Sequence, residues 1–166
     1  SLCYGNEKYV ILSMTDEFIY SSDGITWTQG TMPSSLYWSS VCYGNGKFVA
    51  VNNSSNEFAY STDGITWTQG TLPSSQSWQS VCYGNSKFVA TTEDTTIAYS
   101  TNGTTWTEVT IPNTYYASSI SFIHNKFILI SKYDGTVSES SDGISWTNLE
   151  QDYSRITNLI DNLKTK

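Results

Sequence analysis

One short motif occurs four times in this chain, and its spacing constrains the fold more than any other feature. Residues 20–31 read YSSDGITWTQGT and residues 60–71 read YSTDGITWTQGT, and two fainter copies follow. The copies align on Asp23, Asp63, Asn102 and Asp142, which are separated by 40, 39 and 40 residues. A period of this length is typical of stacked supersecondary units, because each unit buries its apolar surface against the next.

A second landmark recurs in step with the first. Each of four lysines opens a short apolar run, and these are Lys8, Lys47, Lys87 and Lys126. Strand-forming residues and turn residues alternate within each unit, and in the second unit the predicted strands are 38–43, 47–51, 57–61 and 66–70. Four short strands joined by tight turns predict one blade of a β-propeller.

We therefore expect an all-β fold, a propeller of four four-stranded antiparallel blades or a four-blade part of a larger one, with a short C-terminal helix. The expected blades span about 1–31, 32–71, 72–111 and 112–149. The start, SLCYGNEKYV, matches the middle of later units, so the chain is expected to be a piece of something longer.

The tail over 150–166 breaks the period. Its apolar residues recur at helical spacing, and they are Tyr153, Ile156, Ile160 and Leu163. This helix is expected either to dock on the last blade or to begin a coiled coil through which copies of the chain self-associate.

The sequence STDGITW resembles a shortened Asp box, the BNR-like hairpin motif of sialidase-like propellers, with one residue fewer between Asp and Trp. The resemblance extends over all four repeats and implies a propeller fold. It leaves the function open, because Asp-box propellers include hydrolases, receptors, assembly factors and plain binding modules.

The repeated motif residues are expected to be architectural. In the second copy, Asp63 should accept hydrogen bonds from backbone N–H groups of its turn, Gly64 can adopt positive φ, and Trp67 can cover the hairpin. Asn102 keeps the acceptor oxygen without the charge, which argues against metal or catalytic use. The full set is Asp23, Gly24, Trp27, Asp63, Gly64, Trp67, Asn102, Gly103, Trp106, Asp142, Gly143 and Trp146.

Composition excludes several partners. A net charge of -7 argues against nucleic acid and anionic membranes, and no apolar run is long enough for membrane insertion. Cys3, Cys42 and Cys82 share one repeat position without metal-ligand spacing, so we expect core thiols, no metal and no cofactor. The lone His124 is expected to be a solvated turn residue.

An enzymatic role is disfavoured. A sialidase-type site clamps a carboxylate with several arginines, and this chain has only Arg155. Glycoside hydrolysis by two carboxylates stays an alternative. The carboxylates on the expected loops are Asp16, Glu17, Glu93, Asp94 and Asp134.

A ligand is expected on the face that carries the crossovers between blades and the loops after each second strand, since scaffold loops concentrate binding residues. The candidate binding residues are Tyr37, Trp38, Trp78, Tyr115, Tyr116 and Tyr133. Trp38 and Trp78 share a repeat position and fit equally well as core residues.

The favoured function is a non-catalytic recognition module that binds glycan, in a secreted, cell-surface or phage-tail-like protein, and therefore in an extracellular or virion-associated setting. The first alternative is a structural or assembly propeller that binds a protein surface, because both kinds of site use Tyr and Trp. The second alternative is the glycoside hydrolase.

Overall fold

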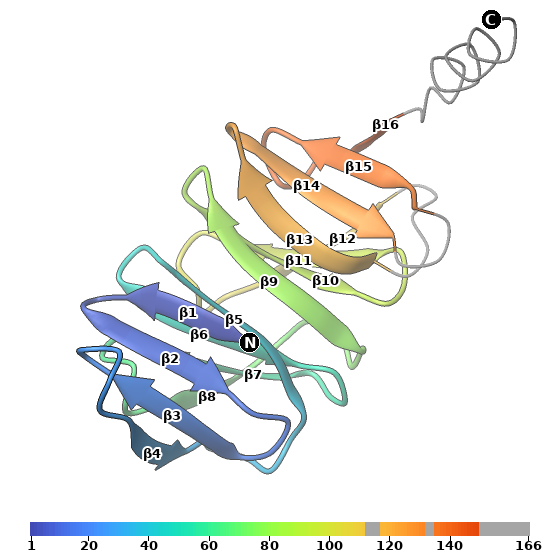
Figure 1. Cartoon of the computed structure of the whole chain (residues 1–166). Helices are drawn as coiled ribbons and strands as arrows, with labels where there is room; N and C mark the ends of the chain where they lie inside the picture. Colours follow the sequence, from blue (N-terminus) through green and yellow to red (C-terminus); the bar gives the residue numbers. More distant parts are fainter. Residues whose placement is uncertain (112–116, 132–134, 150–166) are drawn as a thin grey trace, which may run out of the picture.

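The computed structural model describes residues 1–111, 117–131 and 135–149, and for Ser118 the backbone alone. These residues form four antiparallel sheets of four strands, each with its strands in chain order. Figure 1 shows the sheets stacked side by side as the blades of an open arc, with the first and last blades at opposite ends.

Each blade begins with a strand on the inner side of the arc. Blade 1 comprises β1 (Leu2–Gly5), β2 (Lys8–Leu12), β3 (Glu17–Ser21) and β4 (Thr28–Thr31). Blade 2 comprises β5 (Trp38–Gly44), β6 (Lys47–Asn52), β7 (Glu57–Ser61) and β8 (Thr68–Thr71). Blade 3 comprises β9 (Trp78–Gly84), β10 (Lys87–Thr92), β11 (Thr96–Ser100) and β12 (Thr107–Thr110). Blade 4 comprises β13 (Ala117–Ile123), β14 (Lys126–Ser131), β15 (Val137–Ser140) and β16 (Thr147–Leu149).

The expected strands of the second unit agree with the observed ones to within two residues, but the expected fold class needs a correction. The described residues contain strands and no helix, so the short C-terminal helix is not part of the fold seen here. The segment for which that helix was predicted, 150–166, lies outside the described residues. The self-association expected through this segment therefore stays a prediction.

Successive blades contact each other chiefly through their first strands, in the order β1, β5, β9 and β13. The contact is close because an aromatic ring of each blade lies over a glycine of the preceding blade. A Cβ added to Gly5 would lie 2.0 Å from the ring of Tyr43, and one added to Gly44 would lie 1.9 Å from the ring of Tyr83. Only glycine leaves room for a ring at this distance.

The same contact recurs between blades 3 and 4, where the ring of Phe122 lies over Gly84. The first strands are also joined by hydrogen bonds from a backbone N–H of one blade to a serine hydroxyl of the blade before. Val41 donates to Ser1 Oγ at 3.2 Å, and Val81 donates to Ser40 Oγ at 3.2 Å. The stack is therefore directional, because each blade presents different groups to its two neighbours.

A third contact joins the turn after each first strand to the motif turn of the next blade. The side-chain amides of Asn6 and Asn45 donate to the backbone oxygens of Thr62 and Thr101 at 3.0 and 3.2 Å. Asn85 makes the equivalent bond to Ser141 at 2.9 Å. These bonds fix the rotation of one blade relative to the next.

The core lies between the blades. Val10, Phe18 and Phe48 belong to the apolar cluster that joins blades 1 and 2, and equivalent clusters join the later pairs. Because each blade is only one sheet thick, it buries both faces only when it has a neighbour on either side.

The three cysteines are free thiols, and each lies partly buried between its own blade and the next. Burial raises the pKa of the Cys3 thiol to about 11 and that of Cys82 to about 12. Burial, reinforced by the neighbouring thiols of Cys82 and Cys3, raises the pKa of Cys42 well above its usual range. The thiols are therefore protonated and poorly nucleophilic near neutral pH.

Replacement of Gly44 by alanine tests the ring-over-glycine contact. The added methyl group overlaps the base of the Tyr83 ring, so Gly44→Ala should lower the free energy of unfolding by about 3 kcal/mol. Gly46→Ala is the control, because Gly46 has φ of +73° and open space around it, and should lower that free energy by only about 1 kcal/mol. Denaturant titration measures both.

A rescue experiment separates overlap from other effects of the new side chain. In a Tyr83→Ala background, the further change Gly44→Ala should cost much less than in the wild type, because the ring that overlaps the methyl group is gone. An unchanged cost would contradict the proposed contact.

Candidate functional site

Each motif turn is held by the same network of a serine, an acidic or amide side chain and backbone N–H groups. In blade 2, Ser61 Oγ donates to Asp63 Oδ1 at 2.8 Å and accepts from the backbone N–H of Gly64 at 2.8 Å. Asp63 Oδ1 also accepts from the N–H groups of Ile65 and Thr66, each at 2.8 Å. The expected folding of the carboxylate onto its turn is therefore what the structure has.

Blade 3 shows that the network does not need a charge. Asn102 Oδ1 accepts from the N–H groups of Thr104 and Thr105, each at 2.9 Å. The glycines of all four motif turns have positive φ, and they are Gly24, Gly64, Gly103 and Gly143. These groups hold turns and are not arranged around a common reaction centre.

The serine of the network was not among the residues singled out from the sequence. It is buried in each blade, at Ser21, Ser61, Ser100 and Ser140. The sequence did contain a pattern that indicates this serine, since a serine recurs two residues before each aligned Asp or Asn.

Two of the motif tryptophans, Trp67 and Trp106, fill the space between blades. Trp67 contacts Phe48 of its own blade and Phe18 of blade 1, with ring centroids 6.3 and 5.8 Å apart. Trp106 packs in the same way between blades 2 and 3, on Phe58 and Phe88. These tryptophans join blades in addition to covering a hairpin.

Hydrogen bonds to the motif carboxylates lower their pKa values. Backbone N–H groups of Ile25 and Thr26, followed by the Ser21 hydroxyl, hold the pKa of Asp23 well below its usual range. Burial alone would raise the pKa of Asp63 and Asp142, but the hydrogen bonds outweigh it, and the pKa of Asp142 is lowered to about 2.

Loops and turns divide between two faces as the sequence predicted. The bonds from Asn6 and Asn45 place the turns after the first strands beside the motif turns on one face. On the other face, loops after the second strands bond to the crossovers, for example Asn53 N–H to the Tyr37 oxygen at 3.1 Å and Glu93 N–H to the Ser77 oxygen at 3.2 Å. We call the second of these the crossover face.

A hollow of about 420 Å³ opens on the crossover face, where it is lined by residues of blades 1 and 2 and by one residue of blade 3. It combines exposed apolar groups with hydroxyl and amide groups and no charged side chain. The lining residues are Ser1, Leu12, Ser13, Met14, Tyr37, Trp38, Ser39, Asn53 and Gln79.

Tyr37 lies at the rim of this hollow and is 61% exposed. A second hollow adjoins the first through Met14 and Tyr37 and includes Asp16 and Ser35. Asp16 Oδ2 accepts a hydrogen bond from Ser35 at 2.9 Å, so this carboxylate is engaged in holding the crossover. Tyr37 is thus the one predicted aromatic residue in the described segments that is available as a stacking surface.

Of the other predicted aromatic residues, Trp38 also lines the hollow and Trp78 does not, and neither offers an exposed ring. Trp38 and Trp78 are buried, with 2% and 0% exposure, and each indole N–H donates to a backbone oxygen four residues earlier. The prediction that these two tryptophans bind a ligand is wrong. Each is the first residue of the first strand of its blade, where its ring is buried in the core between blades. Tyr115, Tyr116 and Tyr133 lie outside the described residues.

Met14 and Gln79 were missed at the sequence level. Neither is part of the repeated pattern. Met14 comes from blade 1 and Gln79 from blade 3, so only the stacking of blades 1, 2 and 3 brings them to one hollow. Asn52, from a loop considered for binding, is instead buried and accepts hydrogen bonds from the N–H groups of Ser54 and Ser55 at 3.0 and 2.9 Å.

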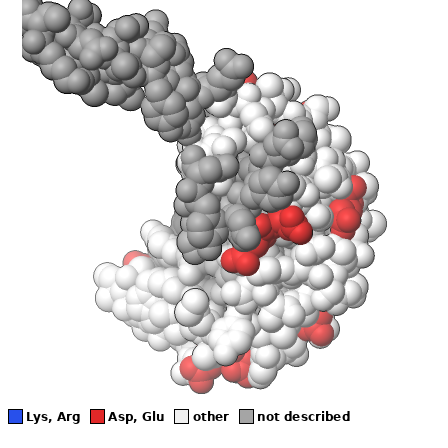
Figure 2. Space-filling view, turned by 90° about the vertical axis from the view of Figure 1, so that its right-hand side faces the viewer, with Lys and Arg blue, Asp and Glu red and all other residues white. Residues whose placement is uncertain are grey.

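Charge on the molecule is mostly negative. Figure 2 shows one side on which Asp and Glu side chains are scattered and no Lys or Arg is in view. The lysines of the described segments each start a second strand, beside the turns of the opposite face, at Lys8, Lys47, Lys87 and Lys126. Within the part described, the crossover face therefore offers no Lys or Arg side chain for a phosphate or carboxylate ligand. The α-amino group of Ser1, which lines the hollow, donates to the Leu12 oxygen at 3.3 Å.

The described residues hold no group of three or more His, Cys, Asp or Glu side chains that could bind a metal ion. They also hold no helix that could span a lipid bilayer.

No protein-family model and no curated protein sequence matches this chain. Among solved structures, it is similar to a streptogramin B lyase with a TM-score of 0.80 and 12% identity, over 92% of this chain and 54% of that one. It is also similar to virginiamycin B lyase from Staphylococcus aureus, with a TM-score of 0.79 and 15% identity, over 91% and 55% of the two chains.

A third likeness is to a chain in a nidogen/laminin complex, with a TM-score of 0.69, 9% identity and coverage of 90% and 63%. This chain spans about half the length of the two lyases. At such identities the likenesses show the fold alone, which is a β-propeller arrangement of four-stranded blades.

Substitutions at Asp63 test the architectural role of the motif. Asp63→Asn should leave the midpoint of unfolding at neutral pH nearly unchanged, because Asn102 makes the same bonds with an amide oxygen. Asp63→Ala should lower the free energy of unfolding by about 1 kcal/mol through the lost hydrogen bonds. Equal and large losses in both variants would show that the charge itself is required.

Acid titration tests the lowered pKa values. A carboxylate whose pKa is lower in the folded than in the unfolded state stabilises the fold above the unfolded value, about 3.9, and loses this contribution as pH falls through the folded value. For Asp142 that window runs from about 4 to about 2. The variant Asp142→Asn should therefore lose less stability than the wild type on acidification over this window, measured by urea unfolding at each pH. Parallel losses in the two proteins would contradict the assignment.

Proposed function

We propose that this chain is a non-catalytic recognition module that binds a saccharide in the hollow beside Tyr37 on the crossover face. The observation that carries the proposal is Tyr37, a residue that is 61% exposed at the rim of a hollow lined by uncharged polar side chains. Binding sites of this kind combine an apolar surface with a few convergent polar groups.

The chemistry of the lining matches a neutral sugar. A pyranose ring has an apolar face that can stack on Tyr37, and its hydroxyls can pair with the amides of Asn53 and Gln79 and the hydroxyl of Ser13. The absence of Lys and Arg side chains from the described crossover face favours an uncharged saccharide over a sialylated or phosphorylated one.

The composition of the hollow also supports a binding role over hydrolysis. Glycosidases place two carboxyl groups on either side of the scissile bond, and none of the residues that line this hollow is an Asp or Glu. We also propose that the repeat is of the Asp-box type, which the hydrogen-bond network around Asp63 supports. We further propose that the parent protein is extracellular or virion-associated, because glycan ligands are displayed outside cells.

A protein surface is the second candidate ligand. It is favoured by Met14, which is 72% exposed and lies beside Tyr37 at the junction of the two hollows. Exposed Met and Tyr side chains are characteristic of protein interfaces, because methionine adapts to irregular apolar surfaces.

A glycan array probed with the purified chain tests the proposal, and Tyr37→Ala tests the site. Loss of a stacking ring should weaken binding of any glycan hit by about 1 kcal/mol, which is roughly fivefold in Kd. The fold should be unchanged, since the bond from Asn53 to residue 37 involves only backbone. Titration calorimetry measures both proteins.

Tyr4→Ala is the matched control, because Tyr4 is 58% exposed but does not line the hollow. It should bind the same glycan as the wild type does. A silent array would favour the protein-surface candidate, and equal binding by Tyr37→Ala and the wild type would place any glycan site elsewhere.

A further inference from the structure

The two ends of the blade stack are not equivalent. Blades 1, 2 and 3 each present a Gly-Asn pair to the next blade, and in blade 4 the same positions hold Ile123 and His124. Both side chains are exposed, and Ile123 is 52% exposed. Since a single Cβ on Gly44 would already overlap the neighbouring ring, Ile123 leaves no place for the ring of a following blade.

Other residues of blade 4 agree with a terminal surface. At the position of Tyr20, Tyr60 and Tyr99, blade 4 has Glu139, whose carboxylate forms a 2.6 Å ion pair with Lys126. A charged pair on the outer face of a last repeat is typical of a cap, because end repeats need a polar surface in water.

Blade 1, in contrast, keeps the groups with which later blades dock on their predecessors. Tyr4 is equivalent to Tyr43 and Tyr83, whose rings lie over glycines, yet Tyr4 is 58% exposed. Its ring centroid lies 4.5 Å from that of Tyr9, and the corresponding distance from Tyr43 to Phe48 is 4.7 Å. The ring is therefore held in the docked arrangement without a partner.

Trp27 repeats this pattern. Its centroid lies 6.3 Å from that of Tyr9, as that of Trp67 lies 6.3 Å from Phe48. Trp67 has a second ring contact, with Phe18 of the preceding blade, and is 9% exposed, whereas Trp27 is 37% exposed. The exposure of Trp27 corresponds to one missing neighbour.

We propose that the open face of blade 1 is the docking surface for one further blade of this repeat, placed before blade 1 in the same propeller. The partner must carry glycine at the position of Gly44, to accept the Tyr4 ring, and asparagine at the position of Asn45, to bond the backbone oxygen of Ser22. Blade 4 of a second copy has neither residue and does not fit.

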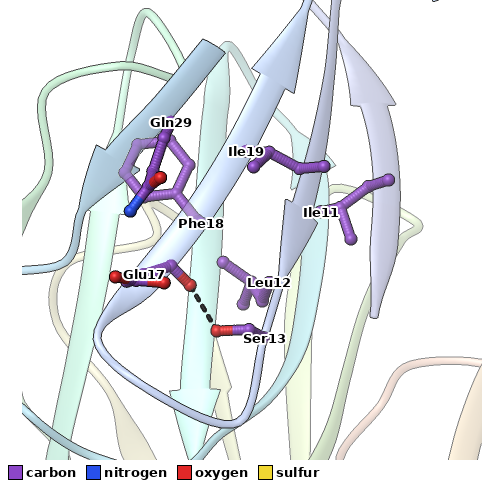
Figure 3. Close-up of a pocket in the computed structure, with 7 residues that line it drawn as sticks. All are labelled: Ile11, Leu12, Ser13, Glu17, Phe18, Ile19 and Gln29. Atoms are coloured by element: carbon purple, nitrogen blue, oxygen red, sulfur yellow. Dashed lines mark hydrogen bonds between the residues drawn. The ribbon is translucent and has the colours of Figure 1, made fainter. Parts of the chain in front are cut away.

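The open face also sets the size of one partner residue. In the buried cluster between blades 1 and 2, Phe18 of blade 1 lies with Ala50 and Ala59, a cross-strand pair of blade 2. Between blades 2 and 3, Phe58 lies in the same way with the pair Ala90 and Ala98. Blade 1 has Ile11 and Ile19 as the equivalent pair, beside each other on the strands that border a hollow of about 180 Å³ (Figure 3). Because two isoleucines leave less room than two alanines, the partner residue at the position of Phe58 must be smaller than phenylalanine.

An extended chain tests the proposal. A second copy of residues 38–79 is fused directly before Ser1, so that the repeat continues in register, and this copy carries Phe58→Val. The readout is nitration of Tyr4 by tetranitromethane, with the exposed Tyr37 as internal reference. Docking of the added blade should slow Tyr4 nitration severalfold relative to the unextended chain, and it should raise the denaturant midpoint.

The matched control is the same extension with Gly44→Ile and Asn45→His in the added copy, the residues that blade 4 has. Tyr4 should then react as in the unextended chain. Equal Tyr4 reactivity in the two extended proteins, whether fast or slow, would overturn the proposal. In the unextended chain, Tyr4 protection that grows with protein concentration would assign the face to a second copy and would also overturn it.

Discussion

The fold depends on one contact, an aromatic ring of each blade lying on the backbone of a glycine in the blade before. Gly5, Gly44 and Gly84 have no side chain, so the first strands of neighbouring blades approach closely enough for N–H groups to reach serine hydroxyls across the gap. The asparagine bonds and the interblade tryptophans then complete the same interface. The contacts of a blade with its two neighbours therefore contribute more to its stability than the hydrogen bonds within its own sheet.

The candidate site follows from this stacking. The repeat builds a scaffold in which motif turns and lysines lie on one face, and crossovers and loops lie on the other. The hollow beside Tyr37 arises where the repeat is broken, because Tyr37 stands where the next crossover has Ser77 and Met14 has no counterpart in the pattern. The proposed recognition therefore uses residues that the scaffold does not need.

The sequence predicted those features that depend on neighbours along the chain. The period, the strands and the bonds around Asp63 are local, so the repeated letters were sufficient. The role of Gly44 was not predictable from its own unit, since the ring that requires it, Tyr83, belongs to the next blade. For the same reason the sequence was equally consistent with a buried and an exposed Trp38. The hollow was not predictable from any single repeat, because its lining comes from different blades. The expected C-terminal helix is not part of the described fold.

Native-state hydrogen exchange, followed by mass spectrometry with peptides from each blade, tests most directly whether neighbours stabilise blades. Blades 2 and 3 have a neighbour on both faces, so amides of β6 and β10 should exchange more slowly than those of β2 and β14, which lie in blades with one neighbour. Protection of β2 equal to that of β6 would contradict the account, because it would show that a blade's own sheet is sufficient for its stability.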